Sequence, residues 1–176
     1  GGFFRDSIVL LSGATGTGKT LLSNTFANEG CSQGERVLII EYEESNDQLL
    51  RNASSWSMDF HKYEKKGLLK IVCLYPEVMG LEDHFLQIKK EIEVFQPKRI
   101  VIDSLSAIQR ISPSIKPFRE FIISVTSYIK QQQITGLFTA TTASLLGGAS
   151  VTEAHISSIT DAIILLRYVE MYGVMH

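Results

Sequence analysis

The amino-acid sequence predicts an α/β fold in which a mostly parallel central sheet carries helices on both faces. First, short apolar runs alternate with segments of helical periodicity along almost all of the 176 residues. Second, the runs are apolar at consecutive positions, which is typical of strands buried on both faces of a parallel sheet. Third, a glycine-rich segment, Gly13-Ala14-Thr15-Gly16-Thr17-Gly18-Lys19-Thr20, joins the first predicted strand to the first predicted helix.

In the first half of the chain, each predicted strand is rich in Ile, Val and Leu and is followed by a helical segment. These strands are expected at residues 7–11, 36–40 and 69–74. The helix over 21–29 is expected to stop at Gly30, because glycine favours helix ends. The helix over 46–57 has Ser45 or Asn46 in position to cap its first turn.

In the second half, the strands are expected at residues 99–103, 137–140 and 162–169. A helix over 81–95 has apolar residues at helical spacing and ends before Pro97. A further helix over 118–132 begins after Pro117, which suits the start of a helix. The alternation of strand and helix therefore continues to the last predicted strand.

No linker, repeat or low-complexity segment divides the chain, so residues 1–176 are interpreted as one domain. Hydrophobic residues make up 44% of the sequence, enough for one compact core. Tyr172-Gly173 resembles the turn of a hairpin whose second strand is missing. We therefore interpret the sequence as a piece of a longer, two-domain protein that is cut short at its C-terminal end.

Composition narrows the class of protein. The net charge of −2 gives no basic excess, so DNA binding is not indicated. The two cysteines lie far apart in the sequence and lack metal-ligand spacing. They are expected to be reduced thiols, as in a cytoplasmic protein. No apolar run approaches the length of a membrane span, so no membrane association is expected.

The glycine-rich segment fits G-x-x-x-x-G-K-[ST], the phosphate-binding P-loop. Lys19 is predicted to reach the β- and γ-phosphates, and the Thr20 hydroxyl to bind Mg²⁺. The alternative is a glycine-rich turn that binds nothing. The strand before the segment and the helix after it favour a site for ATP and Mg²⁺. Its predicted nucleotide-binding residues are Thr15, Gly16, Thr17, Gly18, Lys19, Thr20 and Leu21.

A second acidic anchor for the metal is expected at the end of the strand over 99–103. The strand opens with the basic Arg99 and ends with the carboxylate of Asp103, which is the Walker B arrangement. An Asp at this place could also be only a cap or turn residue. With a P-loop upstream, a metal ligand is favoured, and Ser104 is a candidate to assist it.

Two adjacent glutamates follow the second predicted strand. A carboxylate at this edge of the sheet can activate a hydroxyl or a water for attack on the γ-phosphate, so Glu43 and Glu44 are candidate catalytic residues beside Lys19. The alternative is a solvated acidic loop. Glu41 is the weaker candidate because it is the tail of the strand. Trp56 could stack on the base or could simply be a packing residue.

Hydroxyl residues crowd the segment before the last predicted strand. Thr152, Ser157 and Ser158 are among them. From residue types alone, turn and cap chemistry is the simpler explanation. The alternative is that they accept phosphate.

Several segments match patterns more specific than those of a general P-loop ATPase. Beside the P-loop they are GFFRDS (2–7), YEES (42–45), QLLRNA (48–53), LLKIVC (68–73), IDSLSA (102–107), ITGLFT (134–139) and HIS (155–157). On these residues the chain resembles, nearly end to end, the second ATPase domain of the KaiC family of cyanobacterial circadian clock proteins.

The resemblance implies a RecA-like P-loop domain that forms a hexameric ring with ATP at its subunit interfaces. It also implies autokinase and autophosphatase activity, with Ser157 and Ser158 as acceptors and Thr152 as a nearby third hydroxyl. Glu43 matches the family's proposed general base. Apart from the resemblance, Glu43 is a candidate ligand of the magnesium site, together with Thr20 and Asp103. Trp56 matches a residue near the base, Arg110 a basic residue after the Walker B strand, and the implied partners are KaiA- and KaiB-like clock proteins.

One departure and two alternatives remain open. The family has Ser-Thr where this chain has Ser157-Ser158, so ordered phosphorylation of two different residue types is not implied. A RecA-type ATPase acting on DNA is disfavoured by the near-neutral charge. An oligomeric scaffold held together by ATP, without autokinase activity, is the other alternative.

Overall fold

The computed structural model describes residues 2–142, 156, 158–168, 170–171 and 174–175. Its centre is a six-stranded sheet in the order β3-β2-β4-β5-β1-β6, with every neighbouring pair parallel. The predicted parallel α/β fold is therefore confirmed. The strands are β1 (Ile8–Gly13), β2 (Val37–Glu41), β3 (Leu69–Cys73), β4 (Arg99–Asp103), β5 (Thr135–Thr141) and β6 (Ala162–Leu166).

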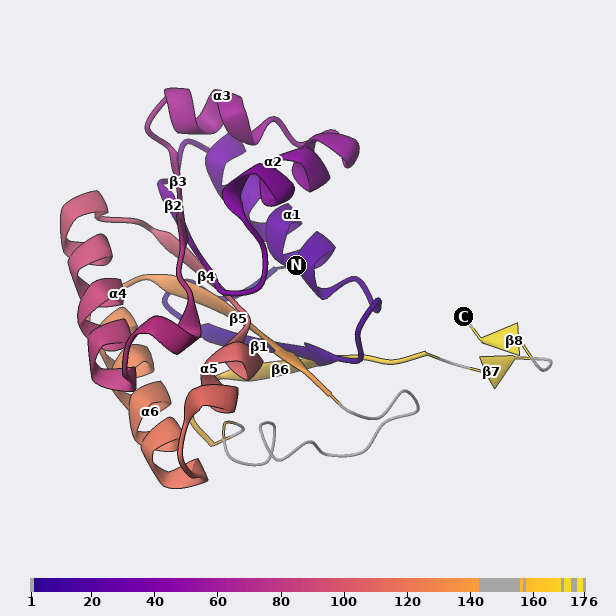
Figure 1. Cartoon of the computed structure of the whole chain (residues 1–176). Coiled ribbons are helices and arrows are strands. Elements are labelled where there is room, and N and C mark those ends of the chain that lie inside the picture. The colour runs from indigo at the N-terminus through magenta and orange to yellow at the C-terminus, as the bar shows by residue number, and fades with distance from the viewer. Residues whose placement is uncertain (1, 143–155, 157, 169, 172–173, 176) are drawn as a thin grey trace.

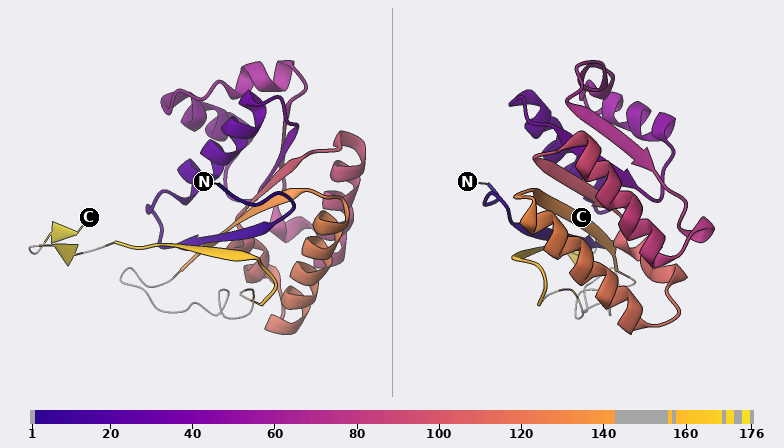
Figure 2. Two further views of the ribbon diagram at one scale, coloured as in Figure 1. Left: turned by 180° about the vertical axis from the view of Figure 1, so that it is seen from behind. Right: turned by 90° about the vertical axis from the view of Figure 1, so that its left-hand side faces the viewer.

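Helices cover both faces of this sheet, as Figures 1 and 2 show. On one face lie α4, α5 and α6, whose apolar side chains pack on Leu38 and Ile40 of β2. The other face packs Val37 and Ile39 of the same strand against α1, α2 and α3. The helices are α1 (Lys19–Ser32), α2 (Asn46–Ser55), α3 (Phe60–Lys65), α4 (Leu81–Phe95), α5 (Leu105–Ile111) and α6 (Ile115–Gln131), with a 3-10 turn, η1 (Pro76–Val78).

The predicted end of the first helix at Gly30 is wrong, because α1 continues to Ser32. Gly30 is instead a packing position. A Cβ atom there would lie 2.8 Å from Cδ of Arg99 and 2.9 Å from Cγ2 of Val37. A residue without a side chain thus lets α1 lie directly on the start of β4.

The starts of the other helices lie at or within a few residues of their predicted positions. Ser45 caps α2 by accepting a hydrogen bond from the backbone N–H of Gln48 at 3.3 Å, and Asn46 is the first helical residue. α6 begins at Ile115, so Pro117 lies within its first turn. The short helices α3 and α5 were not predicted, because six or seven residues contain too few turns to show a clear period.

The expectation of a hairpin without its second strand is also wrong. β7 (Glu170–Met171) pairs antiparallel with β8 (Val174–Met175), so both strands of the hairpin are present. The preceding strand, β6, ends at Leu166, three residues before its predicted end.

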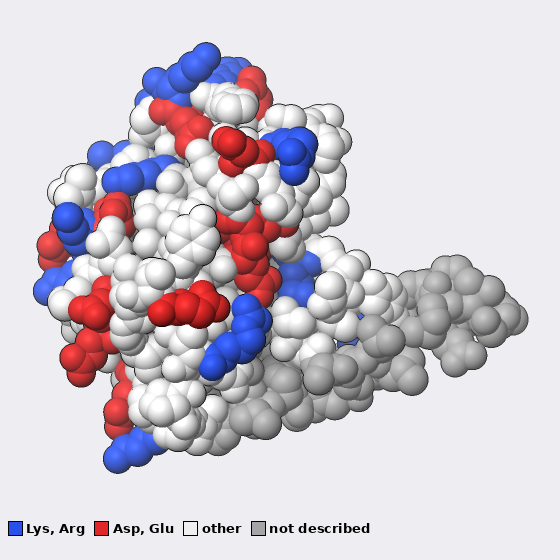
Figure 3. All heavy atoms as spheres, in the orientation of Figure 1, with Lys and Arg blue, Asp and Glu red and all other residues white. Residues whose placement is uncertain are grey.

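The surface carries mixed charge. On the face in Figure 3, Lys and Arg side chains are interspersed with Asp and Glu and form no continuous basic area. Within the described part of the chain, no helix combines the length and the apolarity needed to cross a membrane.

Candidate functional site

The candidate site lies at the carboxyl edge of the sheet. Because the strands are parallel, the ends of β1, β2, β4 and β5 meet at this one edge. The register pairs Glu41 at the end of β2 with Asp103 at the end of β4. The P-loop leaves the same edge from Gly13, at the end of β1. The topology thus brings the P-loop and the predicted carboxylates together.

The P-loop residues form a compact turn that leads into α1. The side chain and the backbone N–H of Thr17 both bond to the carbonyl of Ala14, at 2.8 and 3.3 Å. Gly18 has a φ of 90°, a left-handed conformation that favours glycine, and is the N-cap of α1. The first turn of α1 holds no acidic residue, so its positive end suits an anion such as phosphate.

Lys19 lies at the start of α1 and is largely buried. Its Nζ donates to the carbonyl of Ala14 at 2.9 Å. Burial lowers the pKa of Lys19, while the carboxylates of Asp103 and Glu43 act in the opposite direction. The ammonium group is therefore held between the P-loop and the acidic residues of the site.

Thr20 and Asp103 provide adjacent oxygen atoms. The Thr20 hydroxyl donates to Oδ2 of Asp103 at 3.0 Å, and Thr139 of β5 donates to Oδ1. Asp103 is 5% exposed, and burial raises its pKa, although both hydroxyls and Lys19 oppose the shift. A hydroxyl and a carboxylate side by side are ligands that Mg²⁺ prefers, so these residues fit the metal.

Thr139 was not among the predicted site residues. It lies in β5, which pairs with β4 and ends at the same edge. Thr139 is the only hydroxyl residue of the strand predicted over 137–140, and this was the available signal in the sequence.

Glu43 is an exposed residue that contacts the N-cap of α5 and a basic residue of its last turn. Its Oε1 accepts a hydrogen bond from the Ser104 hydroxyl at 2.9 Å and lies 3.6 Å from Nη1 of Arg110. The structure therefore brings together three residues that the sequence had singled out separately.

Glu44 has a different environment from Glu43. Nδ2 of Asn52 in α2 donates to both of its carboxylate oxygens, at 3.1 and 3.3 Å. Burial raises the pKa of Glu44, and the bond from Asn52 opposes that shift. Both oxygens of Glu44 are thus bonded to α2, whereas the contacts of the more exposed Glu43 carboxylate are made through Oε1.

Glu41, the weaker candidate in the sequence, is a buried part of the site. Its Oε1 accepts the backbone N–H groups of Glu43 at 2.9 Å and Glu44 at 3.0 Å. Burial, followed by the nearby charge of Asp103, raises the pKa of Glu41 to about 8.

The remaining predicted residues are Trp56, Thr15, Leu21 and the three hydroxyl residues. Trp56 follows α2 and packs, half-buried, against the apolar cluster between α1, α2 and β3, so a contact with the base stays a prediction. Thr15 is exposed, and its carbonyl accepts a bond from the Tyr168 hydroxyl at 3.3 Å. Leu21 is 40% exposed. Ser158 lies exposed in a turn before β6, whereas Ser157 and Thr152 are outside the described residues.

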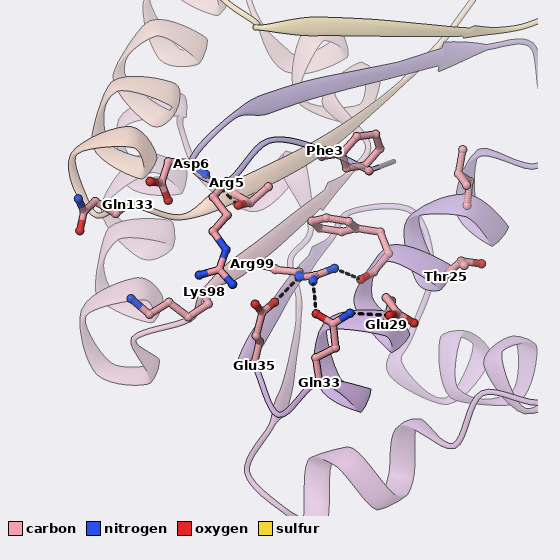
Figure 4. A pocket seen from close by; sticks show the side chains of 14 residues that line it. Phe3, Arg5, Asp6, Thr25, Glu29, Gln33, Glu35, Lys98, Arg99 and Gln133 are labelled. Atoms are coloured by element: carbon pink, nitrogen blue, oxygen red, sulfur yellow. Dashed lines mark hydrogen bonds and ion pairs between the residues drawn. The ribbon is translucent and has the colours of Figure 1, made fainter.

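Arg99, the basic residue of the Walker B strand, lies at the opposite edge of the sheet. Figure 4 shows its guanidinium bonded to Glu35, Gln33 and the carbonyl of Phe26 in a pocket of about 800 Å³. The pocket is lined by residues of α1, of the N-terminal segment and of the starts of β4 and β5. Arg99 thus anchors β4 to α1 and does not face the P-loop.

Comparison with known proteins also indicates an ATPase domain. A family model described as "ATPase: KaiC" matches residues 1–176. The chain is 61% identical to "Circadian clock protein KaiC3" of Synechocystis sp. over 99% of its own length and 34% of that relative. It is 58% and 59% identical to proteins named "Circadian clock oscillator protein KaiC" from Picosynechococcus sp. and Rippkaea orientalis, over 99% of the chain and 34% and 33% of the relatives.

The chain thus spans about a third of the length of these curated relatives. The match nonetheless covers the P-loop, the Walker B strand and the paired glutamates. With a RecA-like P-loop fold and these relatives, the chain belongs to the KaiC family of ATPases.

Proposed function

We propose that this chain is a Mg²⁺- and ATP-dependent serine autokinase domain with slow ATPase and autophosphatase activity. The observation that carries the proposal is the convergence of Lys19, Thr20, Asp103 and Glu43 at the carboxyl edge of the sheet. These are a phosphate-binding cation, a pair of metal ligands and an exposed carboxylate. Phosphoryl transfer needs little else from a protein, because its catalysis is mostly positioning and charge neutralisation.

The P-loop and α1 would hold the triphosphate. Backbone N–H groups from Thr15 to Leu21 would meet the phosphates, and Lys19 would neutralise charge on the β- and γ-phosphates. Thr20 and Asp103 would hold Mg²⁺, with Glu43 as a further candidate ligand. When bound, the metal neutralises charge on the transferring phosphoryl group.

Glu43 is proposed as the general base. It accepts the proton of the Ser157 or Ser158 hydroxyl as that oxygen bonds to the γ-phosphorus. The bond between this phosphorus and the β–γ bridging oxygen breaks, and ADP leaves with the electron pair. With water in place of serine, the same proton transfer gives slow hydrolysis. Lys19 and Glu43 are thus the main catalytic residues, while Glu44 supports the loop through Asn52.

The assembly is part of the proposal. We expect a homo-oligomeric, hexameric ring in the cytoplasm, in which one subunit presents Ser157, Ser158 and Thr152 to ATP bound at its neighbour. The relatives are named as clock proteins, so signalling of the circadian-clock type, with KaiA- and KaiB-like partners, is the expected setting.

The test is mass spectrometry of the intact natural protein after incubation with Mg·ATP, beside a Lys19→Ala variant. Phosphate on Ser157 or Ser158 in the parent, and none in the variant, would support the autokinase. If ATP is hydrolysed while both serines stay unmodified, the chain is an ATPase or a nucleotide-dependent scaffold without autokinase activity.

A further inference from the structure

Glu41 makes contacts that the proposed mechanism has not used. It is 1% exposed at the end of β2, one residue before the Tyr42-Glu43-Glu44 segment. A single carboxylate oxygen, Oε1, accepts the backbone N–H groups of both Glu43 and Glu44. The side chain therefore fixes the two peptide groups from which the paired glutamates project.

The backbone around Glu41 is fixed as well. Its carbonyl accepts the N–H of Leu74, just after β3, at 2.8 Å. The N–H of Tyr42 donates to the carbonyl of Asp103 on the other side, at 2.7 Å. The segment is thus tied to both neighbouring strands up to Tyr42. The backbone N–H groups of the next two residues, Glu43 and Glu44, are bound instead by the Glu41 side chain.

The Glu41 carboxylate is only half satisfied at this position. Among the described residues, Oε2 of Glu41 is buried without a hydrogen-bond partner, and an orphaned buried oxygen costs free energy. An apolar side chain of similar volume would avoid this cost. What the apolar side chain would lack is the acceptor for the two N–H groups.

We propose that Glu41 is a positioning residue, which holds the backbone of Glu43 and Glu44 so that the Glu43 carboxylate meets the attacking hydroxyl. The inference rests on the proposed role of Glu43 as the base. It assigns to Glu41 no contact with ATP, metal or acceptor. Its effect is on the rate of phosphoryl transfer and not on the affinity for nucleotide.

The test compares Glu41→Gln, Glu41→Leu and Glu43→Gln in the intact natural protein. The rate of phosphate incorporation into the Ser157–Ser158 peptide and the Lys19-dependent rate of ATP hydrolysis are measured against ATP concentration. Glu41→Leu removes the acceptor and should lower kcat about 10- to 100-fold, with KM for ATP changed less than about twofold. Glu41→Gln has a side chain of the same shape that keeps one acceptor oxygen, so its kcat should stay within about threefold of the parent value.

Several outcomes would overturn the inference. A parental kcat in a folded Glu41→Leu variant would show that the two bonds are not needed. A Glu41→Gln variant as slow as Glu41→Leu would show that charge matters and not the acceptor. If Glu41→Leu fails to fold, Glu41→Gln alone decides, because a loss of more than tenfold there contradicts the proposal.

The reference variant separates this inference from the proposed function. If Glu43→Gln reacts at the parental rate, the base role fails, and the positioning role fails with it. If Glu43→Gln is slow and Glu41→Leu is not, only the positioning role fails. If the parent gains no phosphate, the autokinase fails, and Lys19-dependent hydrolysis still tests Glu41.

Discussion

β4 is five residues long, and its two ends have opposite electrostatic environments. At the amino end, the Arg99 guanidinium donates to Glu35, Gln33 and the Phe26 carbonyl and stacks 4.9 Å from the Phe26 ring centroid. At the carboxyl end, Asp103 lies beside the buried Glu41 of the next strand. One end pairs its charge within the fold, while the other end gathers buried carboxyl groups.

The carboxylates of the two edges show the same contrast. At the amino edge, the backbone N–H of Ile8 and the Lys130 ammonium lower the pKa of Asp161. At the carboxyl edge, burial raises the pKa of Glu41, Glu44 and Asp103. Charge that is satisfied within the fold serves stability, whereas crowded and buried charge is typical of sites that meet a ligand or metal. The difference predicts which substitutions affect activity and which affect only folding.

The largest difference in ATP turnover is expected between two variants that each lose a lysine, one at each edge of the sheet. Lys19→Ala removes the cation that we propose meets the phosphates and should lower ATP turnover by at least about 10²- to 10³-fold. Lys98→Ala removes an exposed lysine that lines the pocket at the amino edge, and turnover should be unchanged. Hydrolysis and nucleotide affinity are measured for both variants. Equal losses of turnover in the two variants would show that the two edges do not differ in function.

At the carboxyl edge, Glu43→Gln should lower the rate of phosphate transfer and leave the affinity for nucleotide unchanged. Because Glu43 is the proposed general base, its loss should cost about 10²-fold or more in rate. The P-loop, which is the proposed phosphate site, is unchanged in this variant. The measurement is single-turnover phosphate transfer beside equilibrium binding of a nucleotide analogue. Glu44→Gln is the matched control and should have the smaller effect, because Glu44 is bound to Asn52. A reversed order would assign the base to Glu44.

At the amino edge, Arg99→Met should affect stability and leave the nucleotide site unchanged. The variant loses three hydrogen bonds and the stacking on Phe26. We expect a loss of about 1–3 kcal/mol in the free energy of unfolding. Arg36→Met, at an exposed position, should cost less than about 0.5 kcal/mol. Denaturant unfolding gives both values, and nucleotide affinity below the transition should equal that of the parent.

The two edges also differ in what the sequence alone could predict. Short motifs indicated the P-loop, Asp103 and its neighbour Ser104, and the place after a predicted strand indicated Glu43, whereas Arg110 was indicated only by the family resemblance. Their convergence needed the strand register, since Glu43 and Ser104 lie 61 positions apart and meet through a hydrogen bond.

The remaining features depend on tertiary contacts. Glu41 was ranked low because a strand end reveals nothing about which amides its side chain will meet. Gly30 looked like a helix end, although its role depends on Arg99 from a distant strand. Arg99 was placed with the Walker B motif, yet a strand carries its first and last residues to opposite edges of the sheet. Local patterns thus predict the elements, and side-chain roles require the packing.

The smallest expected effect concerns pH and Asp161. Because the pKa of Asp161 is lower in the folded chain than its ordinary value of 3.8, the stabilisation is fully present above that value. It is lost as pH falls through the lower, folded-state pKa. Asp161 is partly exposed, so the contribution is at most about 1 kcal/mol after solvent screening.

Asp161→Asn should therefore destabilise the protein at pH 6–7, and its deficit relative to the parent should shrink as the pH falls below about 4. Thermal unfolding of both proteins across this range measures the difference. Lys130→Met is the matched control, since it removes only the ion pair and leaves the bond to the Ile8 N–H. A deficit that stays constant with pH would mean that the Asp161 charge is not stabilised by the fold. The amino edge would then lack the charge compensation that distinguishes it from the site.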